Sequence, residues 1–266
     1  MGSAGRAAPG AAWNGGPAMT QDNCYQDALR ALAYARLEFP GTYYLAYRDL
    51  PELFRRHVRG RRAVDFGCGA GRSTRFLRRL GFEAVGIDIS ADMLDRAREI
   101  DPAGDYRRVE NDALAGLGQG AFDLVLSAFT FDSIPTLERK AAVLRGLAAL
   151  LGPGGRIVNL VSAPEIYVHE WASFSTRDYP ENRAARCGDP VRIVITDIED
   201  PRPVEDVLWT DAGYREAYAR AGVEVVAEHR PLAREDEPHA WVNETRIPPW
   251  VIYVLGRPGE AGRGDK

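Results

Sequence analysis

The stretch at residues 64–71, Val-Asp-Phe-Gly-Cys-Gly-Ala-Gly, has the residue types and spacing to bind a ligand through its backbone. Glycine permits a close approach of the main chain, and a strand-to-helix turn of this kind presents free N–H groups to a carboxylate or phosphate. Two alternatives are a tight turn that needs glycine only for packing, and a dinucleotide site. The dinucleotide pattern is G-x-G-x-x-G, whereas here the third glycine comes one residue early and Asp65 precedes the first.

Polar side chains recur where the next two predicted strands end. Asp88 lies in the run Gly-Ile-Asp-Ile-Ser at 86–90, and a carboxylate at this edge of a sheet can accept hydrogen bonds from both hydroxyls of a ribose. Residues 110–113, Glu-Asn-Asp-Ala, put a carboxylate and an amide where the edge of a purine would lie. Asp88 taken alone could instead cap a helix. The three strand ends together favour a ligand that contains a nucleoside.

An alternation of strands and helices must position these residues. Strands are predicted at 62–66, 82–90, 106–112, 122–129 and 154–162, and helices at 73–81, 90–100 (with Ser90 as N-cap) and 137–152. Strands that alternate with helices form right-handed crossovers and a parallel sheet. Later segments predict strands at 191–198 and 203–209, a helix at 211–222 capped by Asp211, and strands at 223–230 and 250–257.

The flanks of this alternation differ in composition. Residues 20–58 predict a cap of two or three short helices, with a break at Pro40-Gly41 and with Pro51 in the first turn of the last helix. Residues 1–19 and 259–266 are rich in glycine and are predicted to be a disordered and a flexible tail.

Five segments, VDFGCGAGRST, VGIDISADML, NDAL, FDLVLSAF and LLGPGGRIV, follow one another in the order of the motifs of the class I S-adenosylmethionine-dependent methyltransferases. The chain resembles this family closely over 62–162 and more loosely over 211–256. The resemblance implies an α/β, Rossmann-like fold with a mostly parallel seven-stranded sheet and an antiparallel last strand. The methyltransferase domain would then span 59–258, with a strand-containing insertion at about 163–210 over the substrate site, and S-adenosylmethionine would be the cofactor.

The resemblance also assigns residues to parts of the cofactor. The methionine moiety and the ribose side would contact Asp65, Gly67, Cys68, Gly69 and Gly71, and Asp88 would bind the ribose hydroxyls. The adenine would lie against Ile89 and Met93, with Asp112 at its amino group and Asn111 and Ala113 beside it. Ser127, Ala128 and Phe129 would lie under the cofactor near the sulfonium.

Tyrosines are concentrated in the predicted helical cap, at positions 25, 34, 43, 44 and 47. An aromatic lid over a sulfonium would gain cation–π energy and exclude water. We assign Tyr34 and Tyr44 to the cofactor, and at most one of the adjacent Tyr43 and Tyr44 can face it. The alternative is that these rings pack the cap against the sheet.

Methyl transfer demands alignment, exclusion of water and sometimes removal of a proton, so no fixed catalytic motif is expected. His169, in the aromatic insertion with Tyr167, Trp171 and Phe174, is the first candidate for a general base. His239 and Glu244, between the last two strands, and Asp132 are further candidates. Each of them could be structural instead, Asp132 as a cap of the helix that starts near Thr136.

The acceptor is predicted to be a small molecule. The [DNS]-P-P-[YFW] element that methyltransferases of nucleic acids and proteins often carry is absent after the fourth strand. The paired-glutamate loop of arginine methyltransferases is not evident either. An aromatic pocket favours a planar or apolar acceptor, and Arg177, Arg183 and Arg186 leave room for a carboxylate or phosphate on it. Cyclisation or elimination without methyl transfer, and a non-catalytic binding module, are the alternative functions.

Composition limits the partners and the location. The 266 residues carry a net charge of −4 with arginines interleaved among acids, so a nucleic-acid partner is not expected. The three cysteines (Cys24, Cys68 and Cys187) lack metal-ligand spacing and suggest a reducing compartment without a metal site. With no secretory signal and no apolar run of membrane-spanning length, a cytoplasmic enzyme without membrane contact is expected. We further expect a monomer or homodimer and a role in secondary metabolism.

Overall fold

The computed structural model describes residues 39–109, 114–200 and 202–259. At its centre is a seven-stranded sheet in the order β3-β2-β1-β4-β5-β10-β9. Neighbouring strands pair in parallel from β3 to β5, whereas β10 pairs antiparallel with both β5 and β9. The predicted Rossmann-like topology with an antiparallel last strand is therefore confirmed.

The sheet strands are β1 (Arg62–Phe66), β2 (Glu83–Asp88), β3 (Asp105–Arg108), β4 (Phe122–Ala128), β5 (Leu151–Ser162), β9 (Glu224–His229) and β10 (Trp250–Gly256). The α-helices are α2 (Gly41–Arg48), α3 (Leu50–His57), α4 (Arg72–Arg79), α5 (Ala91–Ile100), α6 (Leu137–Leu150) and α7 (Asp211–Ala221). Short 3₁₀ helices are η2 (Leu114–Leu117), η3 (Thr130–Ser133), η4 (Pro164–Tyr167) and η5 (Pro180–Ala184).

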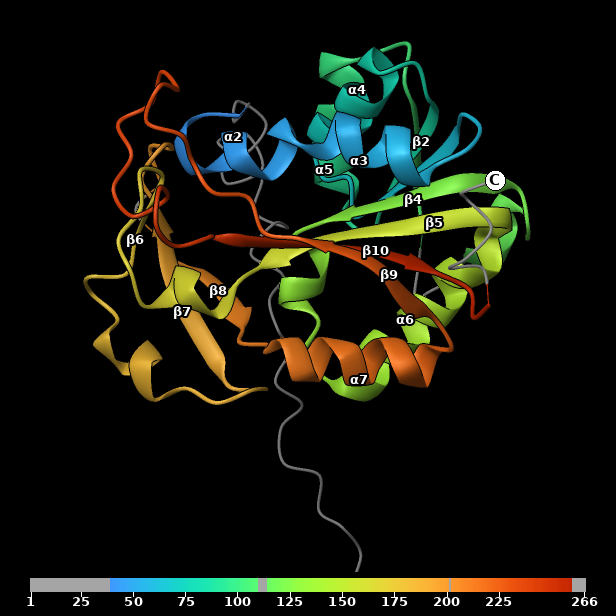
Figure 1. Ribbon diagram of the computed structural model, residues 1–266. Coiled ribbons are helices and arrows are strands. Elements are labelled where there is room, and N and C mark those ends of the chain that lie inside the picture. Colours follow the sequence, from blue (N-terminus) through green and yellow to red (C-terminus); the bar gives the residue numbers. More distant parts are fainter. Residues whose placement is uncertain (1–38, 110–113, 201, 260–266) are drawn as a thin grey trace, which may run out of the picture.

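Two layers of helices sandwich the sheet, with α2 to α5 above it and α6 and α7 below it in the view of Figure 1. The alternation of side chains along each strand builds this arrangement. In β1, Ala63 belongs to the apolar core shared with the cap helices, and Val64 belongs to the core shared with α6 and α7. Both faces of the parallel strands are buried, as expected of a sheet covered on both sides.

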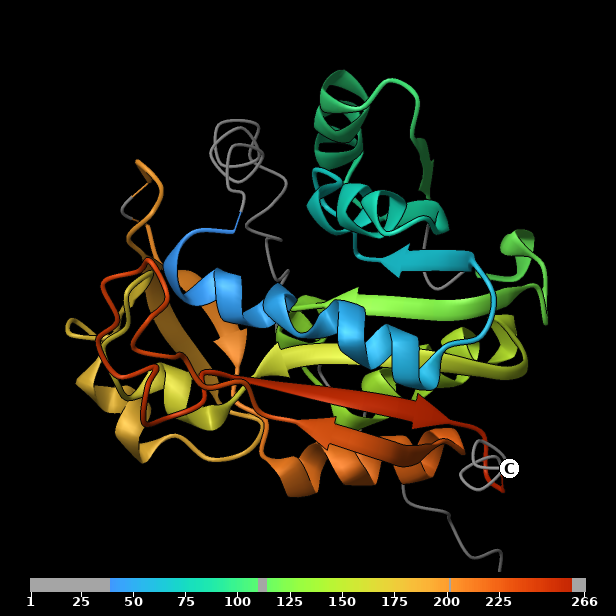
Figure 2. The ribbon, with the colours of Figure 1, turned by 45° about the horizontal axis from the view of Figure 1, so that its top comes forward.

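The cap helices α2 and α3 lie across one face of the sheet (Figure 2). Their buried side chains, among them Leu45, Leu50 and Phe54, join the core of the upper layer. Pro51 stands in the first turn of α3, where a missing N–H costs nothing. The cap is thus anchored by apolar burial, which fixes its inner tyrosines in place.

The segment between β5 and α7 forms a second, three-stranded antiparallel sheet of β6 (Phe174–Ser175), β7 (Pro190–Ile195) and β8 (Val204–Val207). β7 and β8 match the two strands that the sequence predicts, and β6 is an additional short one. The small sheet lies beyond the carboxyl ends of the parallel strands (Figures 1 and 2). Ligands bind at this end of open α/β sheets.

The helix caps correct one prediction and exclude one alternative. The N-cap of α7 is Thr210, whose hydroxyl accepts a hydrogen bond from Gly213 N, so Asp211 is the first helical residue rather than the cap. The N-cap of α6 is Thr136 and not Asp132, which is buried elsewhere. Ser90 caps α5 as predicted, accepting from Met93 N.

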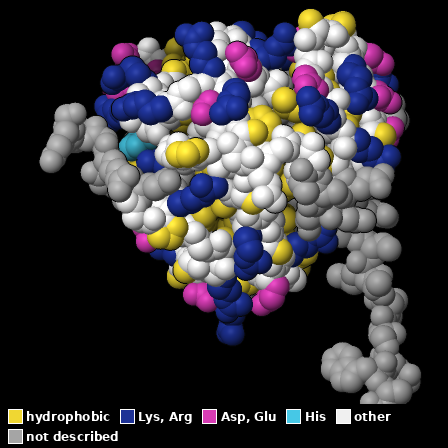
Figure 3. All heavy atoms as spheres, turned by 90° about the vertical axis from the view of Figure 1, so that its right-hand side faces the viewer, with side chains coloured by type: hydrophobic (Ala, Val, Ile, Leu, Met, Phe, Trp, Pro, Cys, Tyr) yellow, Lys and Arg dark blue, Asp and Glu magenta, His cyan; other side chains and the backbone are white. Residues whose placement is uncertain are grey.

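Charged side chains are mixed over the surface. On the face shown in Figure 3, Lys and Arg side chains are scattered among Asp and Glu and do not gather into one patch. Many of them form ion pairs at short sequence separation, such as Arg55 with Glu52 and Arg98 with Asp95. No helix within the described residues is both long and apolar enough to cross a membrane.

Candidate cofactor and acceptor site

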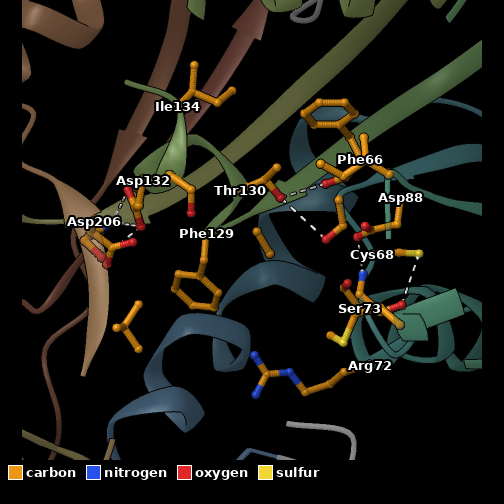
Figure 4. A pocket seen from close by; sticks show the side chains of 18 of the residues that line it. Phe66, Cys68, Arg72, Ser73, Asp88, Phe129, Thr130, Asp132, Ile134 and Asp206 are labelled. Carbon is orange, nitrogen blue, oxygen red and sulfur yellow. Dashed lines mark hydrogen bonds between the residues drawn. The ribbon is translucent and has the colours of Figure 1, made fainter. Parts of the chain in front are cut away.

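A cavity of about 630 Å³ opens at the carboxyl ends of β1, β2 and β4 and continues under the small sheet. Its size lies in the range of small-molecule sites. Figure 4 shows two lobes of its lining, with Phe129 and Thr130 between them. One lobe contains the glycine turn and Asp88, and the other contains Asp132 and Asp206.

The glycine turn has the backbone that its sequence predicts. Gly67 and Gly69 have φ angles of 70° and 52°, which side chains other than glycine rarely adopt. Thr130 Oγ1 donates to Phe66 O at 3.0 Å. A Cβ on Gly67 would come within 2.1 Å of Thr130 Oγ1. Glycine at position 67 therefore allows η3 to close over the turn.

Asp88 is tied to the turn from the end of β2. Its Oδ2 accepts from Gly69 N at 2.8 Å, and its Oδ1 accepts from Ser90 N at 2.8 Å. Burial raises the pKa of this carboxyl, and the backbone hydrogen bonds oppose that shift. Asp88 does not cap α5, so the N-cap alternative is excluded and the carboxylate remains in the cavity lining.

The lining beside Asp88 is apolar. Ile89, Met93 and Val109 border this end of the lobe. Ile89 is 52% exposed, the largest fraction among the exposed large apolar side chains of the described residues. An apolar side chain left open next to a carboxylate suits a flat base attached to a sugar.

Asp65 lies behind the turn rather than in the cavity lining. Its Oδ2 accepts hydrogen bonds from the hydroxyls of Ser73 and Thr74, both at 2.6 Å, which fixes the first turn of α4. Burial raises its pKa to about 6, and the two hydroxyls oppose the rise. Asp65 is predicted to contact the cofactor directly. In the structure its carboxylate instead holds the start of α4, behind the glycine turn.

Arg72, the first residue of α4, enters the same lobe (Figure 4). Its guanidinium lies 4.7 Å from the ring centre of Tyr43 and 5.5 Å from that of Tyr47, at cation–π distance. The two tyrosines also line the cavity. The lobe thus offers a carboxylate at one end and a fixed guanidinium at the other.

Phe129 stands where the two lobes meet. Its φ of 66° is the single positive value of a non-glycine residue in the described part of the chain. The strained turn directs the ring against Tyr43 and Trp250, at centroid distances of 5.8 and 4.8 Å. Such strain persists where the surrounding structure enforces it, often at functional sites.

The second lobe is walled by apolar and aromatic side chains of the insertion and of the strand ends, with the carboxylates of Asp132, Glu205 and Asp206 among them. Asp132 is buried and accepts from Ser162 N, from Ser162 Oγ at 2.8 Å and from Tyr214 OH at 3.0 Å. Asp206, on β8, accepts from Tyr167 OH at 3.0 Å. Burial raises the pKa of Asp132, although the ammonium of Lys140 opposes the shift.

Nine of the residues predicted to form the site line the cavity. Those residues are Gly67, Cys68, Gly69, Asp88, Ile89, Met93, Ala128, Phe129 and Asp132. Gly71 and Ser127 are outside the lining, as Asp65 is. Gly71 packs against Tyr106, and Ser127 is fully buried on the strand face opposite to that of its neighbour Ala128. Tyr34, Asn111, Asp112 and Ala113, which are predicted to contact the cofactor, lie outside the described residues, as does Tyr25 of the predicted cap.

The histidine candidates and Tyr44 lie elsewhere. His169 lines a separate hollow of about 370 Å³ with Glu170 and Arg183. His239 packs against Tyr44 and Trp241, with ring centroids 4.9 and 4.7 Å away, and neither His239 nor Tyr44 lines the main cavity. Of the adjacent tyrosines, Tyr43 faces the cavity, whereas Tyr44 points toward His239 in the β9–β10 connection.

The sequence analysis missed Arg72, Ser162, Asp206 and Trp250. Arg72 directly follows the glycine turn, so its position at a helix N-terminus could have indicated it. Alternation along 204–207 would have put Val204 and Asp206 on one face of a strand. Which face that is depends on tertiary packing.

Taken together, the doubly covered sheet, the glycine turn and the acid at the end of β2 define a Rossmann-like nucleoside-binding protein. Comparisons with known proteins name the family. Residues 64–157 match the family described as "Methyltransferase domain".

Among the relatives, the chain is 28% identical over 181 residues to an N-demethylindolmycin N-methyltransferase of Streptomyces griseus, covering 66% of this chain and 76% of that protein. It is 37% identical over 102 residues to a ubiquinone biosynthesis O-methyltransferase of Methylococcus capsulatus, covering 37% of this chain and 42% of the relative. The chain thus spans less than half of that relative. The solved structure of the CcbJ methyltransferase from Streptomyces caelestis has the same fold, with a TM-score of 0.58 at 20% identity over 83% of this chain and all of that one.

The matched family model, the relatives and the fold together support a class I S-adenosylmethionine-dependent methyltransferase. The predicted enzyme class and the predicted cofactor are thereby confirmed. Cyclisation or elimination without methyl transfer is not favoured.

Proposed function

We propose that this enzyme methylates a small molecule with a flat or apolar body, held in the second lobe of the cavity. One observation carries the proposal: the walls of that lobe are mainly apolar and aromatic, and the insertion forms part of them. The walls include Ile166, Phe174, Ile193, Ile195, Val204 and Trp250. Such walls suit a compact apolar acceptor better than a strand of nucleic acid or an extended peptide.

The residues of the first lobe fit S-adenosylmethionine. Asp88 would accept hydrogen bonds from the ribose hydroxyls, and Ile89 and Met93 would cover the adenine. Arg72 would pair with the carboxylate of the methionine moiety, because a guanidinium held on two aromatic rings is already oriented for it. When bound, the cofactor supplies a methyl group on a sulfonium, which transfers as the S–CH₃ bond breaks and its electron pair stays on sulfur.

The chain's own tasks are alignment, exclusion of water and removal of a proton. Phe129 and Tyr43, at the junction of the lobes, would set the approach of the acceptor and surround the sulfonium with aromatic faces. Of the three predicted catalytic residues, Asp132 lines the acceptor lobe, and burial raises its pKa, which makes the carboxylate a stronger proton acceptor. We therefore assign proton removal to Asp132 rather than to His169 or His239.

The names of the relatives agree with a small acceptor. The Streptomyces griseus relative is named for N-methylation of N-demethylindolmycin, and the Methylococcus capsulatus relative for O-methylation in ubiquinone biosynthesis. From the name of the Streptomyces griseus relative we propose that this enzyme acts in secondary metabolism. A cytoplasmic location is consistent with Cys68 and Cys187, which are free thiols.

The test is a product assay. The protein is incubated with S-adenosylmethionine and either an ultrafiltrate of small metabolites or the retained macromolecules of the same extract. We expect S-adenosylhomocysteine to form with the ultrafiltrate, together with a methylated small molecule detected by mass spectrometry. Turnover confined to the macromolecular fraction, or methylthioadenosine as the product, would contradict the proposal.

A further inference from the structure

The carboxylates of the acceptor lobe distinguish it from a purely apolar pocket. β7 and β8 pair so that Val191 lies opposite Asp206 and Ile193 lies opposite Val204. Side chains at alternate positions share a face of a sheet. Asp206 is therefore the one acid on a face that otherwise carries Val191, Ile193, Ile195 and Val204, all at most 5% exposed.

A carboxylate on such a face costs desolvation energy unless it has partners. Asp206 accepts a hydrogen bond from the hydroxyl of Tyr167, a fully buried residue at the end of η4. Asp132 lies on the same side of the lobe as Asp206 (Figure 4). Both carboxylates belong to the lining, so both face whatever the lobe contains.

The charges around this end of the lobe are predominantly negative. The lining includes Asp132, Glu205 and Asp206, against Arg139, and of these four residues Glu205 and Arg139 are exposed. Lys140 lies behind the wall, donates to Phe131 O and faces the rings of Trp209 and Tyr214, at 4.7 and 5.1 Å from their centres. It offsets part of the negative charge without entering the lining.

The opposite wall of the lobe is aromatic. Phe174 and Trp250 pack edge to face at 5.6 Å, and Tyr43 lies 5.0 Å from Phe174. Aromatic faces are partly negative and attract cations. Acids on one side and ring faces on the other favour the same kind of ligand.

We propose that the acceptor carries a basic nitrogen, held as an ammonium by Asp206, with its apolar body against the aromatic wall. The inference rests on the proposed function, since it names the acceptor class of the same cavity. An ammonium donates charge-assisted hydrogen bonds to carboxylates, whereas a neutral hydroxyl of the same shape gains less and a carboxylate is repelled.

The test uses three probes with one ring and one chain length: phenethylamine, phenethyl alcohol and phenylacetate. Their binding to the protein saturated with S-adenosylhomocysteine is measured by calorimetry. We expect the amine to bind about tenfold tighter than the alcohol or better, and phenylacetate to bind weakest. An amine that binds no tighter than the alcohol, or does not bind, overturns the proposal.

Variants locate the effect. In Asp206→Asn the preference for the amine over the alcohol should fall to about twofold or less, while affinity for S-adenosylhomocysteine is unchanged. Tyr167→Phe keeps the ring, removes the hydroxyl that orients Asp206, and should reduce the preference in part. The matched control is Glu181→Gln, an exposed carboxylate of the insertion paired with Arg192 and outside the cavity lining.

The outcomes separate the inference from the proposed function. If the wild-type protein does not bind S-adenosylhomocysteine, the cofactor assignment itself is in error. If S-adenosylhomocysteine binds and the amine preference survives in Asp206→Asn, the inference fails and the proposed function stands. Weaker binding of S-adenosylhomocysteine to Asp206→Asn would place Asp206 on the cofactor and also overturn the inference.

Discussion

Thr42 and Glu244 lie 202 positions apart in the chain, and the hydroxyl of Thr42 donates to Glu244 Oε1 at 2.7 Å. The same carboxylate accepts from Ala172 N at 2.7 Å and, through its other oxygen, from the backbone N–H groups of Val242 and Asn243. It thereby joins the cap helix α2, the insertion and the β9–β10 connection. The cap helix and the insertion both contribute residues to the cavity lining, and Glu244 is a structural residue that holds them together.

Replacing Glu244 with Ala should lower the free energy of unfolding by about 3–4 kcal/mol, because it leaves several buried donors without an acceptor. Chemical denaturation measures this loss. Glu244→Gln keeps one acceptor oxygen and should recover part of the stability. A Glu244→Ala protein as stable as the wild type would show that the three segments are held by other contacts.

The sequence predicts those parts of the structure that depend on local patterns. Apolar runs alternating with helical periodicity give the order of β1 to β5, and the positions of Asp88 and Phe129 follow because strand ends are local features. The choice between Tyr43 and Tyr44 is not local, because it depends on how α2 is rotated on the sheet. Asp206 could not be predicted for a similar reason. Its side chain faces the cavity because of its register opposite Val191 and because of how the small sheet packs on the rest of the fold.

His169 is a residue that the sequence singles out but that does not line the main cavity. A histidine among aromatic residues after a strand suggests a general base from residue type alone. The backbone after η4 turns it into a hollow beside Glu170 and Arg183, away from the main cavity. Residue type indicated the chemistry that the site needs, but only the folded insertion determines which acid or base reaches it.

Replacing Asp88 with Ala should weaken binding of S-adenosylhomocysteine by about 1.5–3 kcal/mol, the scale of lost charged hydrogen bonds to the ribose. Methylthioadenosine has the same ribose and should lose a similar amount. Calorimetry with both ligands measures the effect. Unchanged affinities would refute the assignment of Asp88 to the ribose.

Replacing Arg72 with Gln should separate the same two ligands. S-adenosylhomocysteine carries the amino-acid carboxylate that we assign to Arg72, whereas methylthioadenosine lacks it. We expect the first to bind about tenfold more weakly to the variant and the second to bind as it does to the wild type. Arg79→Gln, an exposed arginine at the end of the same helix and outside the cavity lining, is the matched control. Equal losses for both ligands would mean that Arg72 shapes the turn instead.

Asp65 should make the stability of the ligand-free protein depend on pH. Its pKa is raised from 3.8 to about 6 by burial, so between these values the folded state binds more protons than the unfolded state. The free energy of unfolding therefore falls as the pH rises through this window, by about 2–3 kcal/mol for two units of pKa. Asp65→Asn removes the titration while keeping an acceptor for Ser73 and Thr74. Relative to the wild type, the variant should gain stability from about pH 4 to about pH 7, as measured by urea denaturation. A constant difference between the two proteins across that range would show that the carboxyl of Asp65 titrates normally in the folded state.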